Sequence, residues 1–177
     1  MKKIITPVDE KTILNLKAGD FVEISGIIYC ARDAAHKRFH KILKKKKPLP
    51  FDPRGQIIYY VGPTPAPPDL PVGSFGPTTS SRMDRYTPEL LKAGVKATMG
   101  KGMRSPMVKK AIVKYRAVYL VTYGGCGAYL SQFVKNLQVI AFDDLGPEAV
   151  YRIEVENFPA IVCIDSYGKD FYECCVK

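Results

Sequence analysis

Short apolar stretches alternate regularly with amphipathic ones across residues 20–142, and this alternation limits the chain to few architectures. Stretches rich in Val, Ile and Tyr predict strands, and helical spacing of apolar residues predicts helices between them. The predicted strands are residues 20–31 (one strand, or two broken at Gly26), 56–61, 95–99, 117–123 and 139–142. The predicted helices are residues 32–43, a segment closed by Gly94 that either is capped by Thr87 or begins earlier, a segment opened by Ser105-Pro106, and residues 128–134.

The C-terminal part of the chain has a different pattern. Residues 149–155 alternate apolar and polar side chains, and residues 160–165 form an apolar run, so we expect two neighbouring strands that pair around Phe158-Pro159. Residues 62–74 are too rich in proline for a regular element and predict a rigid loop. The whole pattern predicts one α/β domain with a mixed sheet over residues 1–177, a length sufficient for one core.

The N-terminus resembles a signal peptide only in its two lysines. Its apolar run stops at Pro7, and the charged residues Asp9, Glu10 and Lys11 follow, so no secretory signal is predicted. The chain also lacks an apolar run long enough to cross a bilayer. We therefore expect a cytoplasmic protein without a membrane partner.

The charge balance favours an anionic partner. The formal net charge is +10 and the pI is near 9.4, as in proteins that bind nucleic acid, membrane surfaces or acidic metabolites. Much of the excess lies between Arg32 and Arg54 and includes the run Lys44-Lys45-Lys46-Lys47. A lysine run beside prolines is most often a solvated loop. A nucleic-acid site would also need exposed aromatic rings, and only Phe39 and Phe51 flank the run.

The cysteines and histidines do not predict a metal site in this chain. The five cysteines are odd in number, widely spaced and without a CxxC, so buried free thiols are expected. The two histidines, His36 and His40, also argue against a self-contained metal site. No Ser-His-Asp order and no GxGxxG motif stands out. If this chain does chemistry, its polar groups look like substrate binders that rely on a catalytic metal from elsewhere.

Three polar segments lie at the predicted junctions before helices. They carry Arg32 in YCARDAAH, Arg82 in GPTTSSRMDRY and Lys101 in GKGMRS. Strand ends and helix starts in α/β sheets attract anions, and arginine can hold a carboxylate with two parallel hydrogen bonds. Each segment alone also fits an interpretation without a ligand. These interpretations are a surface ion pair for Arg32-Asp33, a capping or ST-turn segment for Thr78-Ser81, a tight turn for Gly100-Gly102, and a packed helix histidine for His36.

Five stretches in this order resemble the beta subunit of class I, iron–sulfur-dependent fumarate hydratase and the similar beta subunit of L-tartrate dehydratase. They are ISGIIYCARDAAHKR, PLPFDPRGQIIYYVGPTPAPP, GPTTSSRMDRYTPELL, MGKGMRS and EAVYRIEVENFPAIVCIDSYGKDFY. The resemblance covers nearly the whole chain. It implies a swivelling β/β/α domain, which in single-chain relatives is the C-terminal domain.

The same resemblance implies a partner and a cofactor. The alpha subunit would carry a [4Fe–4S] cluster on three cysteines, with one iron acting as a Lewis acid on the substrate. The two kinds of subunit, suggested as two alpha and two beta, would close around a small dicarboxylate and add water reversibly across the double bond of fumarate. This chain would bind no cofactor itself.

The resemblance also implies a role for each matched residue. Arg32 would hold one carboxylate and Arg82 the other, Lys101 would bind or polarise the dianion, and Thr78 would take part in proton transfer. Thr79 matches the second threonine of the family's pair. Ser80 and Ser81 stand where relatives often have Ala and Gly, and His36 lies in a matched stretch without an assigned role. The predicted substrate-binding set is Arg32, Thr78, Thr79, Ser80, Ser81, Arg82 and Lys101.

Alternative functions remain open from the sequence. Fumarate and tartrate are both dicarboxylates, and the groups that discriminate between them can lie on the alpha subunit. A basic nucleic-acid-binding module is a hypothesis of a different class, and an assembly scaffold without activity is a third.

Overall fold

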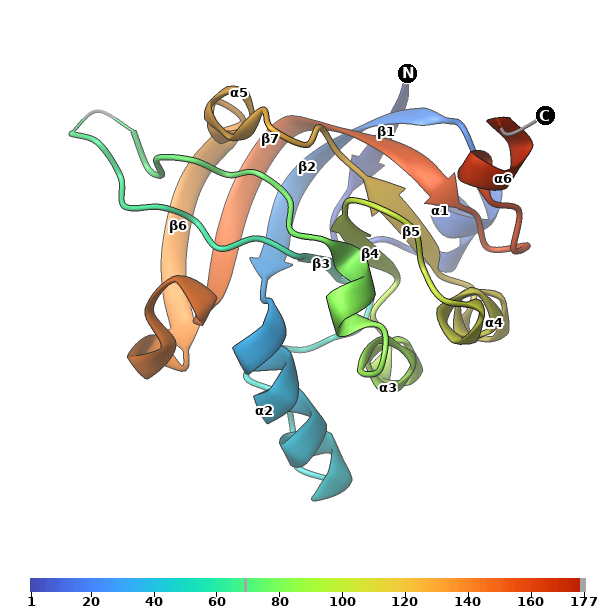
Figure 1. Ribbon diagram of the computed structural model, residues 1–177, viewed down its shortest axis with the longest axis horizontal. Coiled ribbons are helices and arrows are strands. Elements are labelled where there is room, and N and C mark those ends of the chain that lie inside the picture. Colours follow the sequence, from blue (N-terminus) through green and yellow to red (C-terminus); the bar gives the residue numbers. More distant parts are fainter. Residues whose placement is uncertain (69, 176–177) are drawn as a thin grey trace.

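A computed structural model describes residues 1–68 and 70–175 of the chain. Its centre is a five-stranded mixed β-barrel with one further strand on each side (Figure 1). The barrel strands are β2 (Phe21–Cys30), β3 (Ile57–Tyr59), β4 (Ala97–Gly100), β5 (Val118–Val121) and β7 (Val150–Ile164), and the barrel closes because β2 also pairs with β7. The outer strands are β1 (Lys2–Ile5), parallel to β2, and β6 (Val134–Ala141), antiparallel to β7. The predicted mixed α/β domain is confirmed, with the sheet closed into a barrel.

The three longest helices lie on one outer side of the barrel, at the bottom of the view in Figure 1. The longer ones are α2 (Asp33–Lys44), α3 (Thr87–Ala93) and α4 (Pro106–Tyr115), and all three are where the sequence predicts them. Short helices are α1 (Glu10–Asn15), α5 (Gly127–Ser131), α6 (Phe171–Cys175) and the 3₁₀ turns η1 (Ser80–Met83) and η2 (Asp143–Glu148). Among the described residues, no helix combines the length and the apolar character needed to span a membrane.

Two apolar cores follow from the alternation of side chains along the barrel strands. One set of residues fills the barrel around Tyr59, Phe75 and Phe158, where the Tyr59 hydroxyl donates to the Phe75 carbonyl at 2.7 Å. The other set faces the helices and packs Ile58 and Tyr60 among residues such as Phe39 of α2, Leu90 of α3 and Ile112 of α4. Both faces of the barrel strands are therefore packed by buried apolar residues.

Gly26 does not break the strand around it. β2 runs through Gly26, which has a φ of 106° and follows a register shift in the pairing with β7, between Ile24 and Gly26. At this point β2 changes its other neighbour from β1 to β3. A side chain here would meet the Thr6 hydroxyl oxygen, because a Cβ built on Gly26 lies 2.6 Å from it. The glycine thus allows one long strand to serve two neighbours.

The prediction of two strands that pair around Pro159 is wrong. Residues 150–164 form a single strand, β7, which pairs with β2 and aligns Pro159 with Glu23. Proline is tolerated because the outer edge of β7 pairs with β6 up to Val155 and with β5 only from Ile161 onward. Between these two partners no neighbouring strand needs the N–H group that proline lacks.

Two smaller predictions are also corrected. Thr87 is the first residue of α3 rather than its cap, and its hydroxyl donates to the Met83 carbonyl at 3.0 Å. Cys30 and Cys163 are buried free thiols as expected, whereas Cys126 and Cys174 are free but exposed. The fifth, Cys175, has a side chain outside the described part of the structure.

Candidate active site

Loops that carry the predicted site residues meet at one edge of the barrel. Strands β2, β3, β4 and β5 are parallel to their neighbours in this order, so their carboxyl ends point to the same edge. Arg32 follows β2, Lys101 follows β4, and the segment 76–86 returns to this edge after β3 (Figure 1). The carboxyl edge of parallel strands is where open α/β sheets and barrels bind ligands.

A short backbone ladder fixes the Thr78–Ser80 segment beside Lys101. Thr78 N–H donates to the Tyr60 carbonyl at 2.7 Å, and Lys101 N–H donates to the Thr78 carbonyl at 3.3 Å. Ser80 N–H donates to the Lys101 carbonyl at 2.9 Å, and Thr79 and Lys101 form a parallel bridge. The segment is therefore bonded to the ends of both β3 and β4. It brings the half-buried Thr78 and the exposed Thr79 next to the exposed Lys101.

Gly100 permits this close approach. A Cβ built on Gly100 would lie 2.1 Å from the Ser80 hydroxyl oxygen and 3.1 Å from the Thr78 carbonyl oxygen. Ser80 itself is fully buried, and the Tyr119 hydroxyl lies 2.9 Å from its hydroxyl. The structure thus places the Ser80 side chain inside the protein, while Ser81 is exposed at the surface.

Arg32 and Arg82 are joined through one carboxylate. Arg82 donates from Nε to Asp33 Oδ1 at 2.8 Å and lies with its Nη2 2.8 Å from Asp33 Oδ2. Arg32 lies with its Nε 3.5 Å from the same Oδ2 and with its Nη2 3.2 Å from Glu148 Oε1. Glu148 also accepts the Ala34 N–H at 2.8 Å and so ties η2 to the start of α2. The two guanidinium groups therefore have fixed orientations and are still partly open to solvent.

Gly62 makes room for Arg32 on the opposite side. A Cβ built on Gly62 would lie 2.8 Å from Arg32 Nη1 and 3.2 Å from its Cδ. The guanidinium of Arg32 thus lies between the start of the proline-rich loop and Glu148 of η2. A larger residue at position 62 would meet the flexible end of Arg32 first, and it would also lie 3.1 Å from the Pro147 carbonyl oxygen.

His36 is buried beneath Arg32. Its Nδ1 lies 2.9 Å from the Arg32 carbonyl, which can only accept, so the proton is on Nδ1. Its Nε2 is buried and has no hydrogen-bond partner among the described residues. Burial lowers the pKa of His36 to about 4, and the positive charge of Arg104 acts in the same direction. His36 is therefore neutral near pH 7 and supports the backbone at Arg32.

Comparison with known proteins places this chain in a family. The family described as Fumarase C-terminus matches residues 3–175. The chain belongs to this family. Fumarate hydratase 1, mitochondrial, from Leishmania major is 45% identical over 155 residues, which are 86% of this chain and 28% of that protein. Fumarate hydratase class I, anaerobic, from Escherichia coli is 40% identical over 155 residues, with the same two shares.

A relative of similar length carries the name of a subunit. The protein provisionally named L(+)-tartrate dehydratase subunit beta from Methanocaldococcus jannaschii is 40% identical over 179 residues, which are 98% of this chain and 92% of that protein. This fumarase-family chain thus spans less than a third of the hydratases named above and nearly the whole of the tartrate dehydratase homologue.

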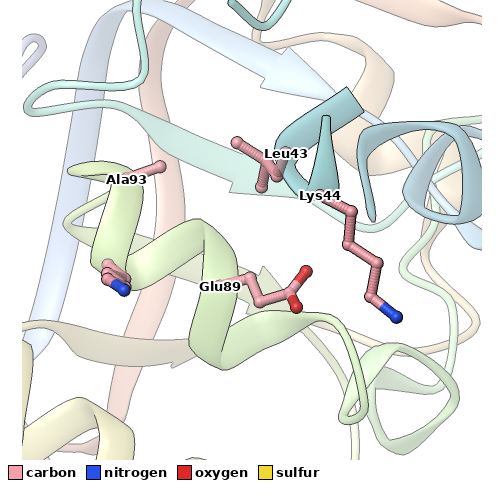
Figure 2. A pocket seen from close by; sticks show the side chains of 5 residues that line it. Leu43, Lys44, Glu89 and Ala93 are labelled. Atoms are coloured by element: carbon pink, nitrogen blue, oxygen red, sulfur yellow. The ribbon is translucent and has the colours of Figure 1, made fainter. Parts of the chain in front are cut away.

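The candidate site of this fumarase-family domain is an open edge. A hollow of about 310 Å³ lies elsewhere, between the end of α2 and α3, and is lined by Leu43, Lys44, Glu89, Lys92 and Ala93 (Figure 2). None of the predicted site residues lines it, or any of three further hollows found in the described part of the chain. Within residues 1–68 and 70–175, no three His, Cys, Asp or Glu side chains come together as metal ligands. The described residues therefore do not fit an iron–sulfur cluster.

The residues that support the site were not predicted from the sequence. Asp33 and Glu148 orient the two arginines, and Tyr119 lies under Ser80. Asp33 was considered only as a surface partner of Arg32, whereas it also binds Arg82. Glu148 and Tyr119 come from distant elements, and their spacing along the chain gives no signal of these contacts.

Proposed function

We propose that this chain is the beta subunit of a heteromeric iron–sulfur hydro-lyase that interconverts fumarate and L-malate by reversible hydration. The observation that carries the proposal is the set of Arg32, Thr78, Arg82 and Lys101 at one open barrel edge in a Fumarase C-terminus domain. The swivelling β/β/α fold type, the single domain over residues 1–177 and the cytoplasmic location belong to the same proposal.

The proposed partner is a cluster-bearing alpha subunit. The relative of matching length is named a beta subunit, and the longer hydratases have more than two thirds of their chain beyond the matching part. A [4Fe–4S] cluster on the partner would supply the Lewis acid, since no three ligand side chains come together among the described residues here. We propose two alpha and two beta chains, with the site completed where the partner covers the barrel edge.

The proposed substrate is a small dicarboxylate held by the two arginines. Asp33 uses one side of the Arg82 fork, and Glu148 uses one end of the Arg32 fork, so the remaining N–H groups are available for substrate carboxylates. Both guanidinium groups are oriented before the substrate arrives. Such preorganisation reduces the entropy lost on binding. Thr79, the exposed Ser81 and the backbone at Ser80 complete the proposed contact surface.

The proposed chemistry at this edge is proton transfer next to a carboxylate. Removal of that proton builds negative charge on the carboxylate, and the fixed charges of Lys101 and Arg82 stabilise the charge in the transition state. The loss of one such partner typically costs about 2–4 kcal/mol of barrier. Thr78 is the proposed proton-transfer group, and its backbone bond to Lys101 fixes it beside that ammonium-bearing residue. His36 is proposed as a support of Arg32 rather than an acid or base.

L-tartrate is a second candidate substrate, because the relative of matching length bears the name of that dehydratase. Dehydration of tartrate yields oxaloacetate, whereas dehydration of malate yields fumarate. An assay of the complex with both substrates therefore distinguishes a fumarate hydratase from a tartrate dehydratase. The nucleic-acid hypothesis is left with the positive charge alone, because the two aromatic rings beside the lysine run, Phe39 and Phe51, are buried and cannot stack on a base.

The test compares variants in the assembled enzyme under anaerobic conditions. Arg82→Ala and Lys101→Ala should each lower kcat/KM for fumarate by on the order of 100-fold without a change in melting temperature. The control is Arg85→Ala, an exposed arginine in the same segment that stacks on Tyr86 instead of binding Asp33. Full activity in Arg82→Ala and Lys101→Ala would refute the site assignment.

A further inference from the structure

A buried ion pair lies directly beneath the candidate site. Arg104 is fully buried and donates from Nε to Asp84 Oδ1 at 2.7 Å. Its other nitrogens reach the Thr98 hydroxyl at 3.1 Å and the Thr87 hydroxyl at 2.7 Å. The guanidinium also lies over the Tyr119 ring at 4.8 Å. Burial opposes the charge, but the neighbouring Tyr60, Asp84 and Tyr119 outweigh it, so the pKa of Arg104 is raised.

The pair fastens two loops of the site to each other. Arg104 belongs to the loop after β4 that carries Lys101, and Asp84 directly follows η1 in the segment that carries Thr78 and Arg82. The second carboxylate oxygen of Asp84 accepts the Ser105 N–H at 2.7 Å, so Asp84 holds both the side chain and the backbone of the opposite loop.

Tyr119 makes a second connection between the same loops. Its hydroxyl lies 2.9 Å from the Ser80 hydroxyl and 2.8 Å from the Gly102 carbonyl oxygen. The two loops are thus joined twice. The Thr78–Ser80 backbone ladder joins them near the surface, and the buried Arg104–Asp84 pair with Tyr119 joins them inside the protein. The relative placement of Thr78 and Lys101 is therefore fixed from two sides.

Stability alone does not account for such a pair. Desolvation of two charges usually offsets their attraction, and well-packed apolar residues of similar volume are often as stabilising. What a fully hydrogen-bonded buried arginine adds is a fixed geometry, because its planar fork accepts few alternative arrangements. The desolvated pair lies between two loops whose relative position must be kept within about an ångström for them to act on one substrate.

We infer that Arg104 is a positioning residue which, with Asp84 as its counter-ion, holds Thr78 and Lys101 in register for the reaction. Arg104 touches no substrate in this arrangement and acts only through the two loops. The inference rests on the proposed hydratase function for its catalytic part. The connection of the two loops by the Arg104–Asp84 pair, called the clasp below, rests on geometry alone and can be tested independently of activity.

The test uses the double variant Arg104→Met/Asp84→Asn. It removes the buried charge and its counter-ion together, and asparagine keeps an acceptor for Ser105 N–H. The matched control is Arg116→Met/Glu10→Gln, because Arg116 and Glu10 form an exposed ion pair at the other end of β5. Arg104→Lys serves as the conservative variant, since lysine keeps the charge without the fork.

The first measurement is amide hydrogen exchange of the full chain. Exchange in residues 78–84 and 100–105 should rise by at least about tenfold in the double variant and stay unchanged in the control pair. Unchanged exchange in these segments would overturn the clasp. This measurement tests the clasp even if the assembled protein has no hydratase activity. A lack of activity would refute the proposed function and not the clasp.

The second measurement is the kinetics of the assembled enzyme. The double variant should lose on the order of 100-fold in kcat, with a much smaller change in KM and an unchanged melting temperature, and Arg104→Lys should recover only part of the loss. Faster exchange with wild-type kcat would show a purely structural pair and overturn the inference. An equal loss of kcat in the control pair would overturn it as well.

Discussion

His36 should make the stability of the chain fall as the pH is lowered. It is fully buried and neutral, with its Nδ1 proton on the Arg32 carbonyl and its Nε2 without a partner among the described residues. In the unfolded chain its pKa returns to the ordinary value of 6.5, whereas burial lowers it to about 4 in the folded state. Between these values the unfolded chain binds the proton and the folded chain does not, so acid favours unfolding.

The size of this effect follows from the two pKa values. The linkage relation gives a loss of about 2 kcal/mol in the free energy of unfolding between roughly pH 7.5 and pH 5, which approaches about 3 kcal/mol below pH 4. This contribution is fully present above the unfolded pKa of 6.5. It is a sizeable share of the stability of a domain of this length.

Urea unfolding of wild type and His36→Asn at both pH values isolates the histidine. Asparagine can donate to the Arg32 carbonyl but does not titrate, so the other ionisable groups cancel in the difference between the proteins. The pH-dependent loss should be smaller in His36→Asn by about 2 kcal/mol. Lys37→Asn, on the exposed side of the same helix, should keep the wild-type loss. Parallel stability changes in wild type and His36→Asn would refute the buried neutral histidine.

Three further predictions concern the packing of two site glycines and the burial of the cysteines. Gly100→Ala should destabilise the chain by about 1–3 kcal/mol in urea unfolding, because the new methyl group meets the Ser80 hydroxyl at 2.1 Å; an unchanged midpoint would contradict the tight ladder. Gly62→Ala should raise KM for fumarate in the assembled enzyme by roughly tenfold, since it displaces Arg32 Nη1; a wild-type KM would argue against Arg32 as a carboxylate ligand. Thiol labelling of the native chain, read by peptide mass, should modify the exposed Cys126 and spare Cys30 and Cys163, whose pKa values are raised by burial, that of Cys163 to about 12; fast labelling of Cys163 would be inconsistent with this burial.

Local patterns in the sequence were sufficient for much of the fold. Ser105-Pro106 opens α4 as predicted because serine and proline suit the first turn of a helix whatever packs against it. The continuity of β7 through Pro159 was not predictable, since it depends on which strands happen to flank that residue. The pairing of β1 with β2 and the closure of β2 on β7 also depend on contacts between distant segments.

The candidate site divides in the same way. Arg32 and Lys101 were recognisable because polar residues just after strands share one edge of an α/β sheet. The burial of Ser80 was not, because it depends on Tyr119 from another strand. Arg104 and Glu148 were also missed, since a charged residue in a loop is normally exposed and only the folded chain shows their partners.

The most direct test of the proposed function is anaerobic purification of the tagged full chain from its native cells, followed by an assay of what comes with it. A second chain with an iron–sulfur chromophore should copurify, and the complex should convert fumarate to malate while this chain alone does not. Conversion of tartrate to oxaloacetate in place of fumarate hydration would assign the second candidate substrate. Purification of the chain alone from cells that retain fumarate hydratase activity elsewhere would contradict its role as half of a hydro-lyase.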